Sequence, residues 1–83
     1  MKPVDMISYN STNGDLQPIK YRLSDEGGMT KIIKIDRIIQ TNEEKLSGNR
    51  MIIFRVQSVI NGLERVYELK YEPSTCKWYI YKM

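Results

Sequence analysis

The dipeptide Asn61-Gly62, which stands between two apolar runs, constrains the fold of this chain more than any other feature. A two-residue type I′ turn needs positive φ at both central positions, and asparagine followed by glycine tolerates this best. The turn also fixes how the flanking strands pair, because Ile60 must then lie opposite Leu63. The sequence therefore predicts a β-hairpin of defined register around residues 61 and 62.

This register places apolar side chains opposite one another on one side of the hairpin. The opposed pairs are Val56 with Tyr67, Phe54 with Leu69, and Ile52 with Tyr71. On the other side Arg55 lies opposite Glu68, and opposite charges favour such a pair. Nothing in the turn itself requires the two strands to agree in this way, so their agreement supports the hairpin.

A second reversal is predicted at residues 73–75, because proline, serine and threonine are typical of a tight turn. The register that follows pairs Tyr71 with Trp78, Leu69 with Ile80, Glu72 with Lys77, Lys70 with Tyr79, and Glu68 with Tyr81. The C-terminal half is then a meander of three strands, Ile52–Ile60, Leu63–Glu72 and Cys76–Lys82. Because Cys76 shares the side of Trp78, we expect its thiol to be buried as a small apolar group.

The N-terminal half is also predicted to be mainly β. Residues 18–23 alternate in polarity, which turns Ile19, Tyr21 and Leu23 inward. Paired glycines at the end of residues 25–28 predict a turn, since glycine adopts positive φ at no steric cost. A further strand is predicted over Val4–Tyr9.

Residues 29–40, MTKIIKIDRIIQ, allow two interpretations. Isoleucine favours a strand, and the doubled isoleucines at 32–33 and 38–39 indicate a bulge or bend. A helix would instead align Ile32, Ile35 and Ile39 on one face. The β-branching and the preceding turn favour a bent strand.

The residues that follow predict one short helical turn. Thr41 and Glu44 have the spacing of a capping box, in which the first residue caps the helix and the fourth bonds back to it. Gly48 is placed to end that turn. We therefore predict a helical turn near 42–47.

The whole chain, residues 1–83, is predicted to be a single mainly β domain with five or six antiparallel strands and this one helical turn. Strands this long in so short a chain must twist and bend, because a flat sheet exposes its edges. The expected outcome is a strongly twisted sheet or a small half-open barrel. A homodimer that pairs one exposed edge is a further way to cover it.

The absence of histidine argues against an enzyme. Without histidine no Ser-His-Asp or Cys-His arrangement can be built, and the most common metal ligand is missing. With Cys76 as the only cysteine, neither an internal disulfide nor a structural zinc site can form. The phosphate-binding patterns GxxxxGK[ST] and GxGxxG do not occur, and no loop has EF-hand spacing. We predict no catalytic activity, no cofactor and no metal site.

Charge and hydropathy predict a cytoplasmic protein that does not use a membrane. The first ten residues, MKPVDMISYN, contain proline and aspartate where a signal peptide needs an apolar core. No apolar run approaches the length of a membrane helix. The net charge of +3 comes from cations and anions that are interspersed, so it gives only weak support to a nucleic-acid partner.

The predicted binding face is the outer side of the C-terminal meander. Its residues are Tyr79, Tyr81, Lys70, Lys77, Arg55, Met51 and Ile53. A protein partner or a second copy fits this set, because interfaces are rich in tyrosine, methionine and arginine. The alternative is RNA or single-stranded DNA stacked on the tyrosines, although Glu68 and its neighbouring carboxylates repel phosphate. A third alternative is that the N-terminal strands cover this face and make it core. The sequence thus predicts a small non-enzymatic binding or assembly module.

Residues 43–83 resemble a family of short proteins from Gram-positive anaerobes. The shared features are EEKL-x-GNRM, QS-x-x-NG-x-ER, YELKYE and TCKWY-x-YKM. The resemblance covers about half of the chain. No activity is assigned to that family, so the resemblance implies no functional residue.

Overall fold

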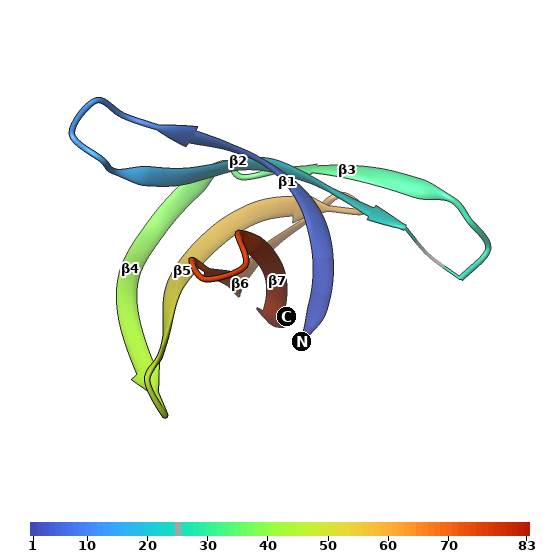
Figure 1. Ribbon diagram of the computed structural model, residues 1–83. Helices are drawn as coiled ribbons and strands as arrows, with labels where there is room; N and C mark the ends of the chain where they lie inside the picture. The colour runs from blue at the N-terminus through green and yellow to red at the C-terminus, as the bar shows by residue number, and fades with distance from the viewer. Residues whose placement is uncertain (25) are drawn as a thin grey trace.

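The computed structural model describes residues 1–24 and 26–83, which form one antiparallel sheet of seven strands. The strands are β1 (Lys2–Asn10), β2 (Leu16–Ser24), β3 (Thr30–Lys34), β4 (Arg37–Leu46), β5 (Asn49–Ile60), β6 (Leu63–Glu72) and β7 (Lys77–Lys82). Their order in the sheet is β3-β2-β1-β7-β6-β5-β4, and the two end strands do not pair with each other. In Figure 1, β1 rises from beside β7 and then crosses the top of the view with β2 and β3, and β4–β7 curve beneath them. The chain is therefore an open, strongly curved sheet, and the predicted number of five or six strands was too low, since there are seven.

The hairpin around Asn61-Gly62 is confirmed. The φ angle is 52° at Asn61 and 78° at Gly62, so both central positions have the positive φ that a type I′ turn needs. Ile60 pairs with Leu63, and the predicted apolar pairs Val56–Tyr67, Phe54–Leu69 and Ile52–Tyr71 follow in the ladder. The turn chemistry thus fixes the register over the full length of β5 and β6.

The predicted pairing of β6 with β7 is confirmed from Glu72 to Leu69 and then fails by one residue. A bulge between Glu68 and Leu69 places Glu68 opposite Lys82, so the predicted neighbour Tyr81 is the extra residue. The prediction for Cys76 was wrong, because this residue ends the loop before β7 and its side chain is exposed. Its φ of 58° turns the chain before the strand begins, so the thiol does not share the side of Trp78.

The predicted helical turn near 42–47 was also wrong, because the described residues contain no helix. Residues 42–46 belong to β4 and pair with β5, with Thr41 opposite Phe54 and Glu43 opposite Ile52. The reversal lies at Ser47-Gly48, where both residues have positive φ. A capping-box pattern stabilises a helix only locally, whereas pairing with β5 satisfies the backbone along the whole segment.

Residues 29–40 are β rather than helical, as predicted, but they form two strands instead of one bent strand. The break lies at Ile35 and Asp36, between β3 and β4. The amide of Ile35 donates to the carbonyl of Ile19 at 2.8 Å, and the amide of Asp36 donates to the carbonyl of Gln57 at 2.8 Å. These two bonds hold the connection between β3, in the layer formed by β1–β3, and β4, in the layer beneath it. Ile39 forms a bulge in β4.

The N-terminal strands are confirmed and are longer than predicted. β1 contains the predicted strand Val4–Tyr9, and β2 turns Tyr21 and Leu23 inward. The inward prediction for Ile19 was wrong, because a bulge opposite Ile7 and Ser8 makes Ile19 the extra residue and turns Pro18 inward instead. Of the predicted turn at residues 25–28, Asp25 lies outside the described residues, and Gly28 has the expected positive φ of 81°.

The core lies between the two layers of this curved sheet. Its buried residues are Tyr21, Ile33, Phe54, Val56, Tyr67, Leu69, Trp78 and Ile80. A chain of buried hydroxyl groups crosses the core, because the Tyr21 hydroxyl donates to the Tyr67 hydroxyl at 2.9 Å and Ser58 lies 2.8 Å from the same oxygen. The β1–β3 layer thus covers the apolar side of the C-terminal meander and not its outer side.

Candidate functional site

The structure brings all seven residues of the predicted binding face onto the outer side of β5–β7, here called the tyrosine face. Its members are Met51, Ile53, Arg55, Lys70, Lys77, Tyr79 and Tyr81. The ladder places Ile53 beside Lys70 and Lys70 beside Tyr79. The N-terminal strands leave this face uncovered, because β1 continues the sheet beside β7, with Pro3 opposite Tyr79. The third alternative, in which the N-terminal strands cover this face and make it core, is therefore wrong.

The central cation of the tyrosine face is buried. Lys70 is only 6% exposed, and its ammonium donates to Glu44 Oε2 at 2.8 Å. The same Nζ lies 3.8 Å from the centroid of the Tyr81 ring, a cation–π contact. Glu44 reaches it from β4, two strands away from β6. Because its charge is already balanced within the chain, Lys70 is not available to a phosphate group.

The remaining cations of the tyrosine face also lie near carboxylates. The Arg55 guanidinium is 3.9 Å from Glu68, and Lys77 lies opposite Glu72 in the ladder of β6 and β7. Hydrogen bonds from Thr75 and Asn49 hold the pKa of the Glu72 carboxyl below its ordinary value, and the charge of Lys77 adds to this. A face whose positive charges are matched in this way attracts a nucleic-acid backbone weakly.

The apolar members of the tyrosine face offer little free surface. Met51 is buried, Ile53 and Tyr79 are half-buried, and Tyr81 is exposed at one edge. These side chains therefore pack mainly against one another and leave little apolar surface for a partner. The binding role of the tyrosine face stays a prediction.

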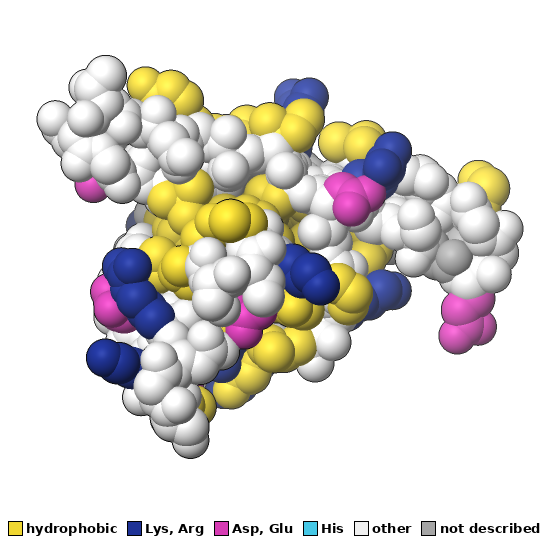
Figure 2. All heavy atoms as spheres, in the orientation of Figure 1, with side chains coloured by type: hydrophobic (Ala, Val, Ile, Leu, Met, Phe, Trp, Pro, Cys, Tyr) yellow, Lys and Arg dark blue, Asp and Glu magenta, His cyan; other side chains and the backbone are white. Residues whose placement is uncertain are grey.

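A second surface, which the sequence interpretation missed, lies on the outer side of the β1–β3 layer. We call it the β1–β3 outer face and define it by Ile7, Tyr9, Lys20, Ile32 and Lys34. Register puts Ile7 beside Lys20 and Lys20 beside Lys34, while the core residues Tyr21 and Ile33 point to the opposite side. Figure 2 shows apolar side chains and cations together along the top of the molecule, where these strands lie.

The apolar members of the β1–β3 outer face are open to solvent. The exposed fraction is 58% for Ile7, 56% for Tyr9 and 59% for Ile32. A shallow pocket of about 350 Å³ lies on the same face between Ile7 and Ile32. Side chains of this kind exposed together on one sheet face mark an interaction surface more often than single exposed residues do.

The charges of the β1–β3 outer face are positive and mostly unmatched. Among residues 1–24 and 26–83, no ion pair involves Lys20 or Lys34. Arg22, on the same side of β2, is paired with Asp5 at 2.7 Å. The face therefore presents isoleucines beside two free cations.

Sequence signals for this surface existed, although the sequence interpretation did not use them. In the pair Ile32-Ile33 a strand must turn one isoleucine inward and the other outward. The same holds for Met6 and Ile7. What the sequence lacked was the pairing of β1 with β2 and β3, which places these outward residues together.

The described residues show neither a metal centre nor a membrane helix. No group of three or more cysteine, aspartate or glutamate side chains comes close enough there to hold a metal ion. None of the elements that the structure describes is a helix long and apolar enough to cross a membrane.

Comparison of the chain with protein-family models, with curated proteins and with solved structures finds no significant match. The similarity of residues 43–83 to a family from Gram-positive anaerobes stays a prediction, and function has to be inferred from the geometry alone.

Proposed function

We propose that the chain is a small, half-open-barrel-like binding module without catalytic activity, which recognises a protein partner through the β1–β3 outer face. The observation that carries the proposal is the exposure of Ile7, Tyr9 and Ile32 on one sheet face. Burying apolar surface contributes about 25 cal/mol per Å². Covering these side chains therefore gives a partner its main source of affinity.

The partner is expected to carry carboxylates beside apolar side chains. Lys20 lies next to Ile7 in the ladder and Lys34 lies next to Lys20, and neither lysine has an ion-pair partner among the described residues. Carboxylates that meet these ammonium groups would orient the partner and raise its rate of association. An acidic, amphipathic protein segment has both features.

A second copy of the chain fits this face poorly. A two-fold symmetric dimer brings the same patch of both copies together. Lys20 and Lys34 of one copy would then lie close to the same lysines of the other, and like charges repel. The proposed partner is for this reason a different protein.

The exposed thiol of Cys76 favours action in the cytoplasm. A free and accessible cysteine is stable in a reducing compartment, whereas it is prone to oxidation outside the cell. A cytoplasmic partner protein is therefore part of the proposal.

The proposal is tested with an acidic peptide that alternates valine with glutamate and has proline at both ends to prevent self-pairing. Binding to the full chain is measured by fluorescence anisotropy. The double variant Ile7→Ser/Ile32→Ser is expected to weaken binding about tenfold or more, because each truncated contact at the centre of an interface costs about 1 kcal/mol. The variant Lys34→Glu is also expected to weaken binding, and its difference in affinity from the unchanged chain is expected to grow as the salt concentration is lowered.

The matched control is Val59→Ser, which removes an equally exposed apolar side chain from β5. It is expected to leave affinity unchanged. Binding of a labelled single-stranded oligonucleotide to the full chain is measured in the same way. Tight, salt-dependent binding of the oligonucleotide, or peptide binding that Ile7→Ser/Ile32→Ser does not affect, overturns the proposal.

A further inference from the structure

The curved sheet has a long free edge at β4, away from the β1–β3 outer face. β4 pairs with β5 along one side, and it is the last of the described strands in the order of the sheet. Figure 1 shows β4 at the left margin of the molecule, with no other labelled strand beside its outer edge. An edge of this kind presents unpaired N–H and C=O groups, on which an extended segment can add as a further strand.

The regular part of this edge runs from Gln40 to Leu46. The bulge at Ile39 interrupts the pairing with β5, and beyond it the ladder continues without a break. All residues of this part except Glu44 are exposed. The other free edge, β3, is only five residues long, and its Lys31 ammonium donates to Asn61 Oδ1 at 2.9 Å. β4 is therefore the edge better suited to an added strand.

The carboxylates of the β4 edge are matched, whereas one cation is not. Arg50 donates to both oxygens of Glu43, at 2.7 and 3.1 Å, and Glu44 accepts from Lys70 at 2.8 Å. Lys45 is exposed and takes part in no ion pair within the described part of the chain. An added strand therefore gains from a carboxylate placed opposite Lys45, since opposite charges favour such a cross-strand pair.

An apolar hollow lies on the inner side of the same strand. Its volume is about 480 Å³, and it is bounded by β4, β5 and the loop between β1 and β2, which extends above β4 in Figure 1. Its apolar lining consists of Leu16, Ile38, Ile52 and Phe54. Thr41 also lines the hollow from β4, and Asp15 lines it from the loop.

Thr41 and Lys45 point to the same side of β4. Thr41 lies opposite the buried Phe54 and Lys45 lies opposite Arg50, and residues four apart in a strand share one face. An apolar side chain placed opposite Thr41 would meet the hollow, whereas Asp15 would repel a carboxylate there. The two positions therefore require different side chains, and this difference sets the direction of an added strand.

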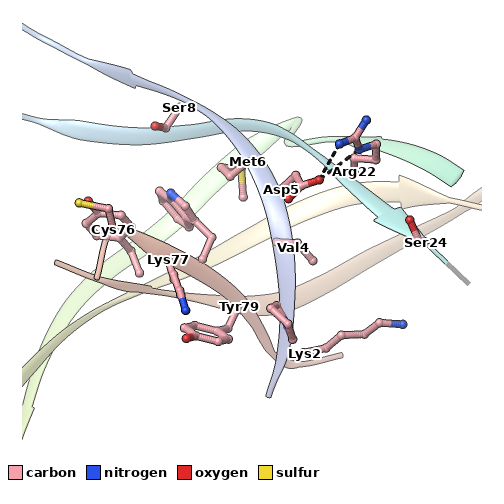
Figure 3. Close-up of a pocket in the computed structure, with 13 residues that line it drawn as sticks. Lys2, Val4, Asp5, Met6, Ser8, Arg22, Ser24, Cys76, Lys77 and Tyr79 are labelled. Atoms are coloured by element: carbon pink, nitrogen blue, oxygen red, sulfur yellow. Dashed lines mark hydrogen bonds and ion pairs between the residues drawn. The ribbon is translucent and has the colours of Figure 1, made fainter. Parts of the chain in front are cut away.

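The hollow between β1, β2 and β7, of about 830 Å³, has no such combination of charge and shape. In Figure 3 the side chains of Lys2 and Lys77 point apart, and Arg22 is paired with Asp5 at 2.7 Å. The ring of Trp78 beside this hollow is buried. Charge, apolar surface and an open strand edge come together at β4 instead.

We propose that the free edge of β4 binds an extended segment of a partner protein, which adds to the sheet as a further strand. The segment runs antiparallel to β4, because antiparallel pairing is the more stable. It carries a carboxylate opposite Lys45 and, four residues later, an apolar side chain opposite Thr41. β4 of a second copy lacks this pattern, because Ser47 follows Glu43 at that spacing and Gly48 follows Glu44. This site is separate from the β1–β3 outer face and does not depend on the proposed function.

The probe is the peptide VETTTLT with both ends blocked, in which leucine follows glutamate by four residues. Its binding to the full chain is measured from amide chemical shifts and from hydrogen exchange. The amides between Gln40 and Leu46 that do not bond to β5 are expected to become protected from exchange. The amides of β3, at the other edge of the sheet, are expected to exchange as before.

Two N-methylated versions of the peptide test whether the backbone carries the binding. Alternate amides of an added strand point toward β4, and the others point to solvent. Methylation of the first set is expected to weaken binding tenfold or more, and methylation of the second set is expected to leave it nearly unchanged. Both versions keep every side chain, so each is the matched control of the other.

A charge exchange tests the register. Lys45→Glu is expected to weaken binding of VETTTLT about fivefold or more and to reverse the preference of the chain for VETTTLT over VKTTTLT. Lys34→Glu makes the same charge change on β3 and is expected to have no effect. The variant Ile7→Ser/Ile32→Ser is expected to bind VETTTLT normally.

The inference is overturned if both N-methylated peptides bind alike, or if Lys45→Glu still prefers VETTTLT. It is also overturned if about 1 mM VETTTLT, an affinity of only about 4 kcal/mol, gives no binding. Loss of binding in Ile7→Ser/Ile32→Ser overturns it as well, because the peptide would then lie on the β1–β3 outer face. These results leave the proposed protein-binding face intact, so the two proposals fail separately.

Discussion

The contact between Lys70 and Glu44 predicts a measurable coupling energy on the tyrosine face. Their side chains are 8% and 28% exposed, and the Nζ–Oε2 distance is 2.8 Å. At an effective dielectric constant of about 20, such a pair attracts by roughly 6 kcal/mol before desolvation. Desolvation of the buried ammonium offsets most of this attraction. We expect a net coupling of about 1–2 kcal/mol, above the ~0.2–1 kcal/mol typical of exposed pairs.

The perturbation is a double-mutant cycle. Glu44→Gln leaves the Lys70 ammonium buried without its carboxylate, so it is expected to lower the free energy of unfolding by about 2 kcal/mol. Lys70→Met removes the buried charge and leaves Glu44 partly hydrated, so it is expected to cost only about 1 kcal/mol. The double variant should cost less than the sum of the two, by about the coupling energy.

Urea denaturation followed by Trp78 fluorescence measures all four proteins, at 0.1 M and at 1 M NaCl. Because Lys70 is shielded by Tyr81, the coupling should persist at high salt. The Arg50–Glu43 pair, whose side chains are 51% and 55% exposed, is the matched control and should lose its coupling there. A Lys70–Glu44 coupling below about 0.3 kcal/mol, or one that 1 M NaCl removes, would refute the reasoning. Lys70 would then be a hydrated cation, available to nucleic acid.

Three further outcomes are expected. Gly62→Ala should destabilise the chain by about 1–2 kcal/mol in urea, since a Cβ is strained at φ 78°; an unchanged midpoint would argue against the type I′ turn. Phe54→Ala should lower the free energy of unfolding by about 3–5 kcal/mol, which is comparable with the whole stability expected of 83 residues. A near-ultraviolet circular dichroism spectrum typical of a folded protein at 37 °C would contradict this. Burial raises the pKa of Tyr21 and Tyr67 above 10.0, so their contribution to the free energy of unfolding should be fully present below pH 10 and should be lost as the pH rises above 10. Tyr21→Phe should make this loss of stability with pH shallower. An equal slope in both proteins would count against the buried hydroxyl chain.

The C-terminal meander could be predicted from sequence because its information is local. Asn61-Gly62 sets the register of β5 and β6, and the apolar residues of both strands agree with it. The same reasoning extended to Trp78 and Ile80 in β7. The predicted register fails at the bulge beside Glu68, because a bulge inserts one residue and the alternation of apolar and polar residues does not reveal where it lies.

The segment after residue 40 could not be predicted in the same way. Thr41 and Glu44 carry a helix-start pattern, and only the presence of β5 beside them decides for a strand. That error hid the partner of Lys70, because a helical Glu44 would not have reached across β5. The sequence interpretation consequently listed Lys70 in the predicted binding face without its ion-pair partner.

The β1–β3 outer face depends on the pairing of three strands, and the sequence does not reveal the register of that pairing. Ile19 is displaced by a bulge, and the outward direction of Ile7 and Ile32 follows only once β1, β2 and β3 are paired.

The most direct test of the account is the isoleucine methyl NMR spectrum of the full chain, titrated with the acidic valine–glutamate peptide. We predict that the methyl signals of Ile7 and Ile32 shift together, whereas those of the core residues Ile33 and Ile80 stay in place. A shift confined to Ile53 on the tyrosine face, or no shift at any isoleucine, would contradict it.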